Sequence, residues 1–426
     1  MSDAAILAAV DARRQDLIGL AQDLIRFPTL NPPGRHYREI CEYLGTRLIA
    51  QGFEVDYVRA IGAPGDSDRH PRWNMVARLQ TAPGPCVHFN GHHDVVEVGQ
   101  GWTRAPFAGT VEGDRLYGRG ACDMKGGLAA AVIAAEAFIA TRPGFRGAVE
   151  TSATADEESG GYGGVAWLAD HGWFAPDRVD HVIIPEPLHK DRICLGHRGV
   201  WWAEVETQGR IAHGSMPFLG DSAIRHMGAL LAEIEERLYP ALAARTTAMP
   251  VVPEGARAAT LNINAIHGGQ AEPLPGDTSL PAPCVADSCR IVLDRRFLIE
   301  EDLAQVKAEV TSLLDGLAAT RPGFRYAIRD LFEVHPVMTD AAAPVVACTA
   351  AAIERVLARR PDLVASPGTY DQKHIDRIGR LKNCIAYGPG LLHLAHQPDE
   401  WVGIQDMIDS AKVMALVLAD LLPLAG

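Results

Sequence analysis

The chain has 426 residues, of which 47% are hydrophobic and 22% charged, and its formal net charge is -13. This length is enough for a large core and for two or more domains. The acidic balance argues against nucleic acid or an anionic membrane as the main partner, because either would favour a basic face. The composition therefore predicts an ordinary globular protein and disfavours these two partner classes.

Residues 1–27 predict an amphipathic helix and not a signal peptide. Acidic residues occur early, and no unbroken apolar stretch precedes a small-residue cleavage site. No run of about 18 or more apolar residues occurs, so the sequence predicts no membrane span. The eight cysteines are scattered and match no zinc-ribbon spacing, which predicts reduced thiols in a cytoplasmic protein. Apolar residues of the expected helix recur at Ile6, Val10, Leu17, Leu20, Leu24 and Ile25.

The first half of the chain alternates helical and strand-like segments. Helices are expected at 36–51 and 124–141. Strands are expected at 53–58, 73–79, 86–90, 110–117, 148–153 and 181–185. This alternation predicts an α/β domain whose central sheet is mostly parallel and covered on both faces.

The pattern changes near residue 199. Strands at 200–208, 260–266 and 289–297 alternate with helices at 213–238 and 301–317, in an order that indicates a small ferredoxin-like α+β sandwich. After residue 336 the α/β character returns, with a helix at 341–359, a strand at 384–388 and a helix at 406–422. We therefore predict a discontinuous α/β domain, residues 1–198 and 336–426, with a smaller domain, 199–335, inserted into it.

The first chemical motif lies at the end of the strand expected at 86–90. The chain passes through Gly91 to His92 and Asp94. Residues two apart in an extended chain lie on one face, so Asp94 can accept the second ring N–H of His92. That bond would fix the tautomer that presents a lone pair to a metal. A His-x-Asp pair alone is weak evidence.

Two acidic motifs follow. Asp123 lies between a glycine-rich loop and a helix, where its two oxygens could bridge two cations, although alone it could be a helix N-cap. Asp156, Glu157 and Glu158 follow an apolar strand and precede a glycine pair. Like charges this close repel one another, so a buried version needs cations or protons. One of these carboxylates could ligate a metal while its neighbour holds the attacking water.

Two further motifs also end strands. Glu186 follows the apolar strand at 181–185, and His396 lies in the loop 388–400 after the strand at 384–388. Ligands of open α/β sheets bind at the carboxyl ends of parallel strands, and four of the five motifs follow such strands. The motifs are therefore expected to meet at one edge of the sheet.

The ordered motifs GHxD (91–94), GRGxxDMKGG (118–127), DEExGG (156–161), an acid at a strand end and AHxPxE (395–400) occur together. Over nearly the whole chain they resemble the metallopeptidase and deacylase family of acetylornithine deacetylase, succinyl-diaminopimelate desuccinylase, aminoacylase and carboxypeptidase G. The resemblance implies two divalent metal ions, for which oxygen and imidazole ligands suit zinc, manganese or cobalt. It pairs His92 with Glu186, pairs Glu158 with His396, and makes Asp123 the bridge.

The resemblance also implies the catalytic groups. Glu157 would be the general base, taking a proton from a metal-activated water and passing it to the leaving nitrogen. Asp94 would support His92. The peptide after Asp123 is often cis in relatives, so a cis bond is expected between Asp123 and Met124.

Other implied roles concern the substrate. His213, in the segment 209–217, would reach the site of a partner subunit and stabilise developing negative charge. The inserted domain would then be a lid and dimerisation domain of a homodimer. Arg296 would bind a substrate carboxylate, with Arg295 as the fallback. Tyr370 and Asp371 lie in a segment that resembles the family's late substrate loop.

Three functions remain open at this point. The leading hypothesis is hydrolysis of the amide of an N-acylated amino acid or a similar small carboxylate. The alternative is hydrolytic deamination of an aromatic amine that carries a carboxylate, as in a nitroanthranilate-type aminohydrolase. Trp201 and Trp202 would favour it if they face the substrate, although packing in the lid sheet is the simpler interpretation. A metal-binding scaffold is the third, and Glu157 argues against it.

Overall fold

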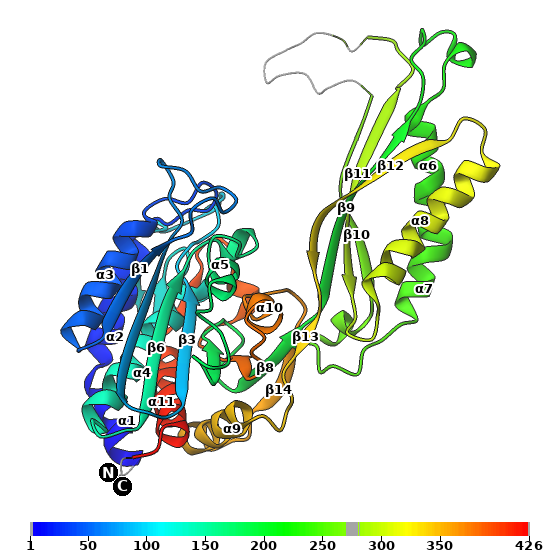
Figure 1. The fold of residues 1–426 in the computed structure, drawn as a ribbon. Coiled ribbons are helices and arrows are strands. Elements are labelled where there is room, and N and C mark those ends of the chain that lie inside the picture. The colour runs from blue at the N-terminus through cyan, green and yellow to red at the C-terminus, as the bar shows by residue number, and fades with distance from the viewer. Residues whose placement is uncertain (1–2, 270–279, 281, 425–426) are drawn as a thin grey trace. The chain divides into compact units, whose positions relative to one another are not determined.

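A computed structural model describes residues 3–269, 280 and 282–424 (Figure 1). The chain divides into two compact units. The larger unit consists of Met1–Gly196, Met338–Val364 and Tyr370–Gly426. The smaller unit consists of His197–Val337 together with Ala365–Thr369. The predicted boundaries, by contrast, place this last short segment in the larger domain.

The larger unit is built on a nine-stranded sheet. Its four central strands, β6, β3, β7 and β15, run parallel, whereas β1, β2 and β8 pair antiparallel with their neighbours. The α/β prediction with a mostly parallel centre is therefore confirmed, and the antiparallel strands lie outside that centre. The order along the sheet is β1 (Glu54–Arg59), β2 (Trp73–Ala82), β6 (Gly147–Thr154), β3 (Cys86–His92), β7 (His181–Ile184), β15 (Cys384–Ala386), β8 (Arg192–His197) and β13 (Val337–Met338), with β14 (Asp362–Ser366) also paired to β8.

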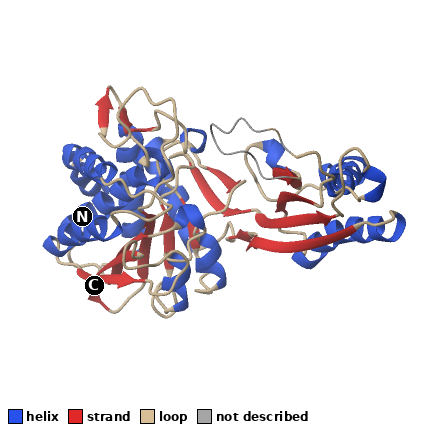
Figure 2. Ribbon diagram, turned by 90° about the horizontal axis from the view of Figure 1, so that it is seen from above, coloured by secondary structure: helices blue, strands red, loops and turns tan. Residues whose placement is uncertain are grey.

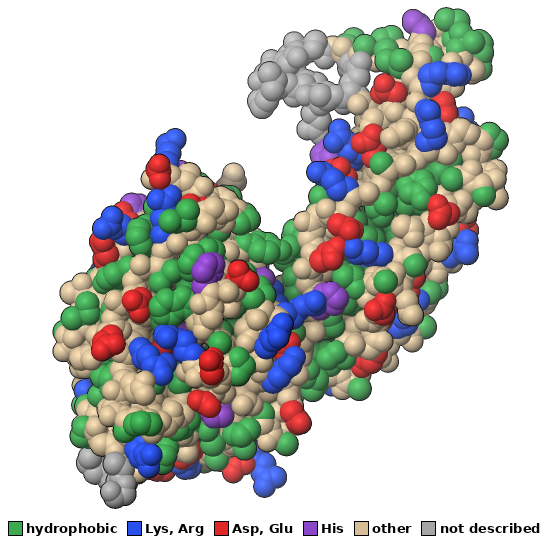
Figure 3. Space-filling model, in the orientation of Figure 1, with side chains coloured by type: hydrophobic (Ala, Val, Ile, Leu, Met, Phe, Trp, Pro, Cys, Tyr) green, Lys and Arg blue, Asp and Glu red, His purple; other side chains and the backbone are tan. Residues whose placement is uncertain are grey.

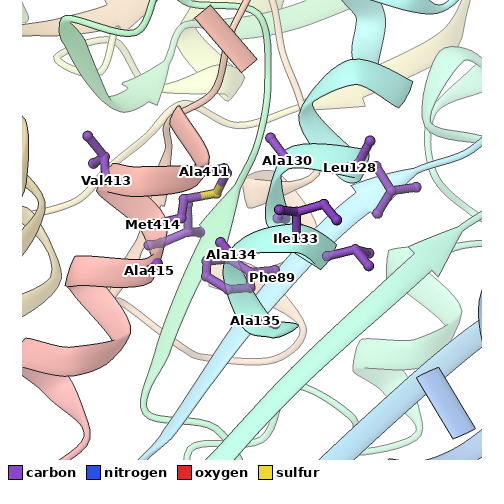
Figure 4. Packing of buried hydrophobic residues seen from close by; sticks show 14 of the residues in the cluster. Phe89, Leu128, Ala130, Ile133, Ala134, Ala135, Ala411, Val413, Met414 and Ala415 are labelled. Atoms are coloured by element: carbon purple, nitrogen blue, oxygen red, sulfur yellow. The ribbon is translucent and has the colours of Figure 1, made fainter. Parts of the chain in front are cut away.

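Strand β3 has an apolar face and a polar face. Phe89 belongs to the core that helices α4 (Gly126–Thr141) and α11 (Ile404–Leu421) complete, and Figure 4 shows it beside Ala134 and near Met414. His88, Asn90 and His92 alternate with these apolar positions and are also buried. Figure 2 shows the sheet of the larger unit between helices. The polar face of β3 therefore leads directly to the candidate site.

Helix α4 and the turn before it are the most apolar helical stretch of the described chain. Within the described residues, Ala121–Thr141 is the one helix long and apolar enough to cross a membrane, and 83% of its most apolar 18-residue window is buried inside the protein. Such burial is typical of a core helix. All eight cysteines lie in the described ranges as reduced thiols, and Cys122 is buried with its Sγ 3.4 Å from the Leu391 carbonyl oxygen.

Several predicted elements are divided in the structure. The N-terminal helix is two helices, α1 (Asp3–Ala12) and α2 (Arg14–Arg26). The strand expected at 110–117 is a hairpin of β4 (Thr110–Glu112) and β5 (Arg115–Tyr117), because Gly113 turns the chain with a φ of 60°. Further elements of this unit are α3 (Tyr37–Ala50), α5 (Val165–Asp170), α9 (Pro344–Leu357), α10 (Gln372–Arg377) and β16 (Trp401–Gly403).

The smaller unit is a four-stranded antiparallel sheet packed on helices. Trp201 belongs to its core, and its ring centroid lies 5.9 Å from the Nζ atom of Lys307 in α8 (Leu303–Thr320). Trp202 alternates to the other face of the sheet, where its ring centroid lies 5.5 Å from that of Phe332. Trp201 therefore serves sheet packing, as the simpler interpretation held. The chain order is β9 (Gly199–Gln208), α6 (Ala223–Glu233), α7 (Tyr239–Ala243), β10 (Thr260–Gly268), β11 (Ser288–Phe297), α8 (Leu303–Thr320) and β12 (Arg325–Val334).

The helix predicted over 213–238 is wrong in its first ten residues. Helix α6 begins only at Ala223, and the preceding segment is a loop with one 3-10 turn at Pro217–Leu219. Ser222 caps the helix by accepting the Arg225 backbone N–H at 3.4 Å, which fixes the start. Glycine and proline in the loop oppose helix formation before that point.

The surface of each unit has a feature that bears on function. Acidic and basic side chains are intermixed on the visible face of the larger unit (Figure 3). In the smaller unit, large apolar side chains of the segment 211–224 are exposed by 42–78%. They are Ile211, Met216, Phe218, Leu219 and Ile224.

Candidate active site

The structure brings the five predicted metal ligands into two overlapping groups. His92, Asp123 and Glu186 form one group, and Asp123, Glu158 and His396 form the other. Within each group the possible ligand atoms all lie within 4.8 Å of one another. Asp123 belongs to both groups, which is the arrangement that the family resemblance implies.

His92 is the last residue of β3 and directs its Nε2 atom into the first group, 3.1 Å from Asp123 Oδ1. Its Nδ1 atom lies 3.0 Å from the backbone oxygen of Asp94 and 3.5 Å from the Asp94 carboxylate. We expected Nδ1–H to be donated to the carboxylate, but the nearer acceptor in the structure is the carbonyl, and the carboxylate is the more distant contact. With Nδ1–H donating there, the Nε2 lone pair faces the ligand group.

The Asp94 carboxylate binds the acidic loop instead. Its Oδ1 accepts the backbone N–H of Glu157 at 3.1 Å, and its Oδ2 accepts that of Glu158 at 3.2 Å. Asn31 donates to the same Oδ2 at 2.8 Å. Burial raises the pKa of Asp94, but the contacts with His92 outweigh it and hold the pKa below its usual value. Asp94 is therefore an anion that orients the acidic loop.

Glu400 performs a similar task for Asp123. Its Oε1 accepts the backbone N–H groups of Cys122 at 2.9 Å and of Asp123 at 3.0 Å. Its Oε2 accepts a hydrogen bond from the buried guanidinium of Arg119 at 2.6 Å. The Asp123–Met124 peptide is cis, as the resemblance implied. Glu400 is the last residue of the motif AHxPxE, but no role was predicted for it from the sequence. Its place in that motif was the signal that could have identified it.

The remaining two ligands lie on different sides of the cluster. His396 Nε2 lies 3.1 Å from Glu158 Oε1 and 3.5 Å from Asp123 Oδ2, and its side chain is 48% exposed. Glu186 follows β7, where Gly127 allows close packing, since a Cβ there would lie 2.0 Å from the Pro185 oxygen. His396 therefore marks the open side of the cluster and Glu186 its buried side.

The charges of the two groups fit divalent cations. Burial, helped by the charge of Asp123, raises the pKa of Glu158 to about 8 and that of Glu186 well above its usual value. Burial also opposes ionisation of Asp123, but hydrogen bonds with His396 and His92 lower its pKa. Clustered buried carboxylates need protons or cations as counter-charges. Two divalent ions supply that charge, and carboxylates with imidazoles are a suitable donor set.

Glu157 lies beside these groups but belongs to neither. Its Oε1 lies 3.3 Å from the Nζ of Lys373, a buried lysine that sequence reasoning missed. The signal was weak, because Lys373 stands two residues after the predicted substrate-loop residue Asp371. A general base must be close to the metal ligands without being a ligand itself, and Glu157, which is next to Glu158 in the chain, belongs to neither group.

The two late-loop residues differ. Tyr370 is buried, and its hydroxyl donates to Gln372 Oε1 at 2.6 Å. A hydroxyl held in this way does not fit the predicted substrate contact. Asp371 is also buried, with Oδ2 accepting from Asn90 at 3.2 Å, while its Oδ1 has no hydrogen-bond partner among the described residues. Of these two residues, Asp371 is therefore the one with a polar atom, Oδ1, that a ligand could contact.

In the smaller unit, His213 has a defined tautomer. Its Nδ1 accepts the backbone N–H of Ser215 at 3.2 Å and lies 2.7 Å from the Ser215 hydroxyl. In the neutral ring the proton is then on Nε2, so the exposed imidazole presents a donor.

Arg296 and Arg295 have different environments. Arg296 makes a two-bond pair with Asp294, at 2.7 and 3.0 Å, and keeps 24% of its side chain exposed. Arg295 is 1% exposed and pairs with Glu301 at 2.6 Å. This burial excludes Arg295 as the fallback for carboxylate binding.

The fold and the two ligand groups identify the class of this protein as a metal-dependent hydrolase with a dinuclear type of metal centre. Residues 88–420 match the sequence model of the peptidase family M20/M25/M40. The chain belongs to that family, whose metallohydrolases act on amide C–N bonds. A scaffold without catalysis is therefore no longer a competing interpretation.

Sequence relatives extend over nearly the whole chain. The succinyl-diaminopimelate desuccinylase of Methylobacterium sp. (strain 4-46) is 33% identical, over 94% of this chain and 95% of that protein. The enzyme of the same name from Methylorubrum extorquens is 31% identical, over 94% of this chain and 97% of that protein.

Solved structures share the fold at lower identity. Human carnosine dipeptidase 1 has a TM-score of 0.77 at 19% identity, covering 98% of both chains. The M20 family metallo-carboxypeptidase Sso-CP2 from Sulfolobus solfataricus has a TM-score of 0.76 at 20% identity, covering 95% of this chain and 98% of that one. A Bacillus subtilis protein described as a dinuclear metal-binding peptidase from the M20 family has a TM-score of 0.67 at 15% identity, covering 96% and 99%.

Proposed function

We propose that the protein hydrolyses the amide bond of an N-acylated amino acid or a similar small carboxylate. The observation that carries the proposal is the position of Glu157 beside, but outside, the two ligand groups. The name of the desuccinylase relatives supports an acylated amino acid as the substrate class.

In this proposal two divalent ions, zinc, manganese or cobalt, bind at the two groups. His92 and Glu186 hold one ion, Glu158 and His396 hold the other, and Asp123 is shared. When bound, such ions polarise the scissile carbonyl and lower the pKa of the attacking water. The donor set described above supports this assignment.

The chain's own groups perform the proton transfers and the orientation. Glu157 accepts the proton of the attacking water and delivers it to the leaving nitrogen. His213 of a second copy of the chain donates from Nε2 to developing negative charge, for which its tautomer is suited. Arg296 binds the substrate carboxylate, and Asp371 offers its Oδ1 atom to a substrate donor.

We also propose a cytoplasmic homodimer. The reduced thiols are typical of a reducing compartment. The exposed apolar side chains of the segment 211–224 would be covered by a second copy of the chain, as is usual for clustered exposed apolar residues.

The test compares the wild type with Glu157→Gln, each loaded with zinc or manganese. Glu157→Gln should keep two metal ions per subunit and lose at least roughly a hundredfold in kcat, the usual contribution of a general base. The substrates are N-succinyl and N-acetyl amino acids and aminobenzoates, with carboxylic acid and ammonia as separate readouts. Wild-type turnover by Glu157→Gln would remove the proposed base. Ammonia release from aminobenzoates alone would establish the aminohydrolase alternative.

A further inference from the structure

We infer that Lys373 is a positioning residue that holds the general base Glu157 in its working orientation. The inference rests on the proposed function. The side chain of Lys373 is 3% exposed and that of Glu157 is 12% exposed, and their Nζ and Oε1 atoms are 3.3 Å apart. A buried ammonium needs a close counter-charge, and Glu157 supplies it here.

The position of Lys373 is fixed by contacts that do not involve Glu157. Gln372 donates from Nε2 to the carbonyl oxygens of Cys384 at 2.8 Å and Leu195 at 3.1 Å, which anchors the start of α10 to β15 and β8. On the other side, His374 Nε2 donates to the Gly160 carbonyl oxygen at 2.7 Å. The ammonium is therefore presented from a rigid segment, unlike the long, mobile side chains of surface ion pairs.

The backbone of Glu157 is also fixed, because its N–H group donates to Asp94 at 3.1 Å. The remaining freedom of Glu157 lies in its side-chain torsions. Contact of Oε1 with Lys373 restricts these torsions and leaves Oε2 for the water and the leaving nitrogen. Misplacing a catalytic group by about an ångström is enough to lower a rate strongly.

The local charges also call for a cation at this place. Asp371 lies near the same ammonium: burial raises its pKa to about 7, and the charge of Lys373 acts in the opposite direction. Asp371 is itself held by Asn90 of β3. Lys373 thus balances two carboxylates that belong to neither metal-ligand group.

The competing role for Lys373 is direct contact with a substrate carboxylate. The two roles differ in a double-mutant cycle with Glu157. A group that acts through Glu157 loses its effect once that carboxylate is removed. Removal of a group that contacts substrate lowers kcat/KM by the same factor in both backgrounds and raises KM.

The experiment uses the full-length protein loaded with zinc, and compares Lys373→Met, Lys373→Arg, Glu157→Gln and the double variant Lys373→Met/Glu157→Gln. Lys373→Met should bind two metals, lower kcat by about 10–100-fold, as loss of a supporting partner does, and leave KM nearly unchanged. Lys373→Arg should restore most of the rate. In the Glu157→Gln background, Lys373→Met should change the residual kcat by less than about twofold. Lys382→Met is the control, because Lys382 is 74% exposed and pairs only at the surface with Asp376.

Thermal unfolding of the metal-free proteins gives a second readout. Lys373→Met should change Tm differently in the wild-type and Glu157→Gln backgrounds, because the buried pair exists only in the former. Equal loss of kcat in both backgrounds, a raised KM, or unchanged kcat in Lys373→Met would each overturn the inference. Lys373→Gln takes its place in the cycle if Lys373→Met does not fold. Wild-type turnover by Glu157→Gln would instead count against the proposed function.

Discussion

The carboxylate of Asp94 accepts the backbone N–H of Glu157 at 3.1 Å. The other oxygen of the same carboxylate accepts the N–H of Glu158, and the backbone carbonyl of Asp94 lies against His92 Nδ1. One residue therefore orients a proposed ligand from β3, a proposed ligand from the acidic loop and the proposed base.

Asp94→Ala should weaken metal binding by about 10–100-fold, since partners that orient ligands have effects of this size. The rate at saturating metal should also fall, because Glu157 loses its backbone anchor. Chelator competition followed by metal analysis measures the affinity. Asp68→Ala is the control, because Asp68 has a 99% exposed side chain. Unchanged affinity in Asp94→Ala would show that the acidic loop is held without it.

Glu400→Ala should lower the free energy of unfolding by about 3–5 kcal/mol, because it leaves the buried Arg119 guanidinium with backbone carbonyl contacts but without its carboxylate counter-charge. It should also weaken metal binding, since Glu400 holds the backbone N–H of Asp123. Urea unfolding and metal titration measure the two effects separately. If Glu400→Ala lowers the stability but leaves the metal affinity normal, Glu400 stabilises the fold and does not orient Asp123 for metal binding.

The family and the candidate ligands could be predicted from sequence because each ligand lies in a short local motif. His92, Asp123 and His396 are each flanked by glycines or other marked residues within a few positions. The partners of these residues could not be predicted in the same way. Lys373 reaches Glu157 across 216 positions of the chain, and Glu400 reaches Asp123 across 277. Such contacts depend on the packing of distant segments, which local patterns do not record.

The errors in the fold have similar causes. The prediction of a helix from residue 213 gave too little weight to Gly214, Pro217 and Gly220, which favour a loop. The helix starts only after Ser222, which caps it. For Arg295 and Arg296 the family resemblance gave the order of preference, but not their environments. Strand alternation buries Arg295 against Glu301 and leaves Arg296 partly exposed, which depends on the register of β11.

Gly127→Ala should displace the strand end that carries Glu186. A Cβ at this position would lie 2.0 Å from the Pro185 carbonyl oxygen, so the backbone must move at a cost of about 1–3 kcal/mol. Gly19→Ala in α2 is the matched control, because a Cβ there meets open space among the described residues and alanine favours the helix by about 0.5–1 kcal/mol. Urea unfolding should therefore give opposite signs for the two variants, and metal affinity should fall only in Gly127→Ala. Equal stabilisation would contradict the close approach of Gly127 to Pro185, the residue that follows β7.

Glu150 should give the protein a distinct acid sensitivity away from the metal ligands. Its buried carboxylate contacts His88 at 2.8 Å, Arg78 at 3.0 Å and Arg178 at 2.6 Å. Burial raises the pKa of Glu150, but the hydrogen bond and charge of His88, with the two arginines, outweigh burial and lower it. A carboxyl whose pKa is lower in the folded than in the unfolded protein stabilises the fold above the unfolded value, near 4.5. This stabilisation is lost as the pH falls through the lower, folded value.

Glu150→Gln should accordingly reduce the free energy of unfolding by about 3 kcal/mol at pH 7, where a buried ion pair is broken. The difference from the wild type should shrink as the pH falls below about 4.5, because the unfolded wild type then takes up a proton at this carboxyl before the folded protein does. Urea unfolding at a series of pH values between 7 and 3 measures this difference. Glu112→Gln, whose carboxylate pairs with Arg104 at the surface, should leave the pH dependence nearly unchanged. The free energies of unfolding of Glu150→Gln and the wild type could instead differ by the same amount at every pH. The charge of the carboxylate would then not stabilise the fold.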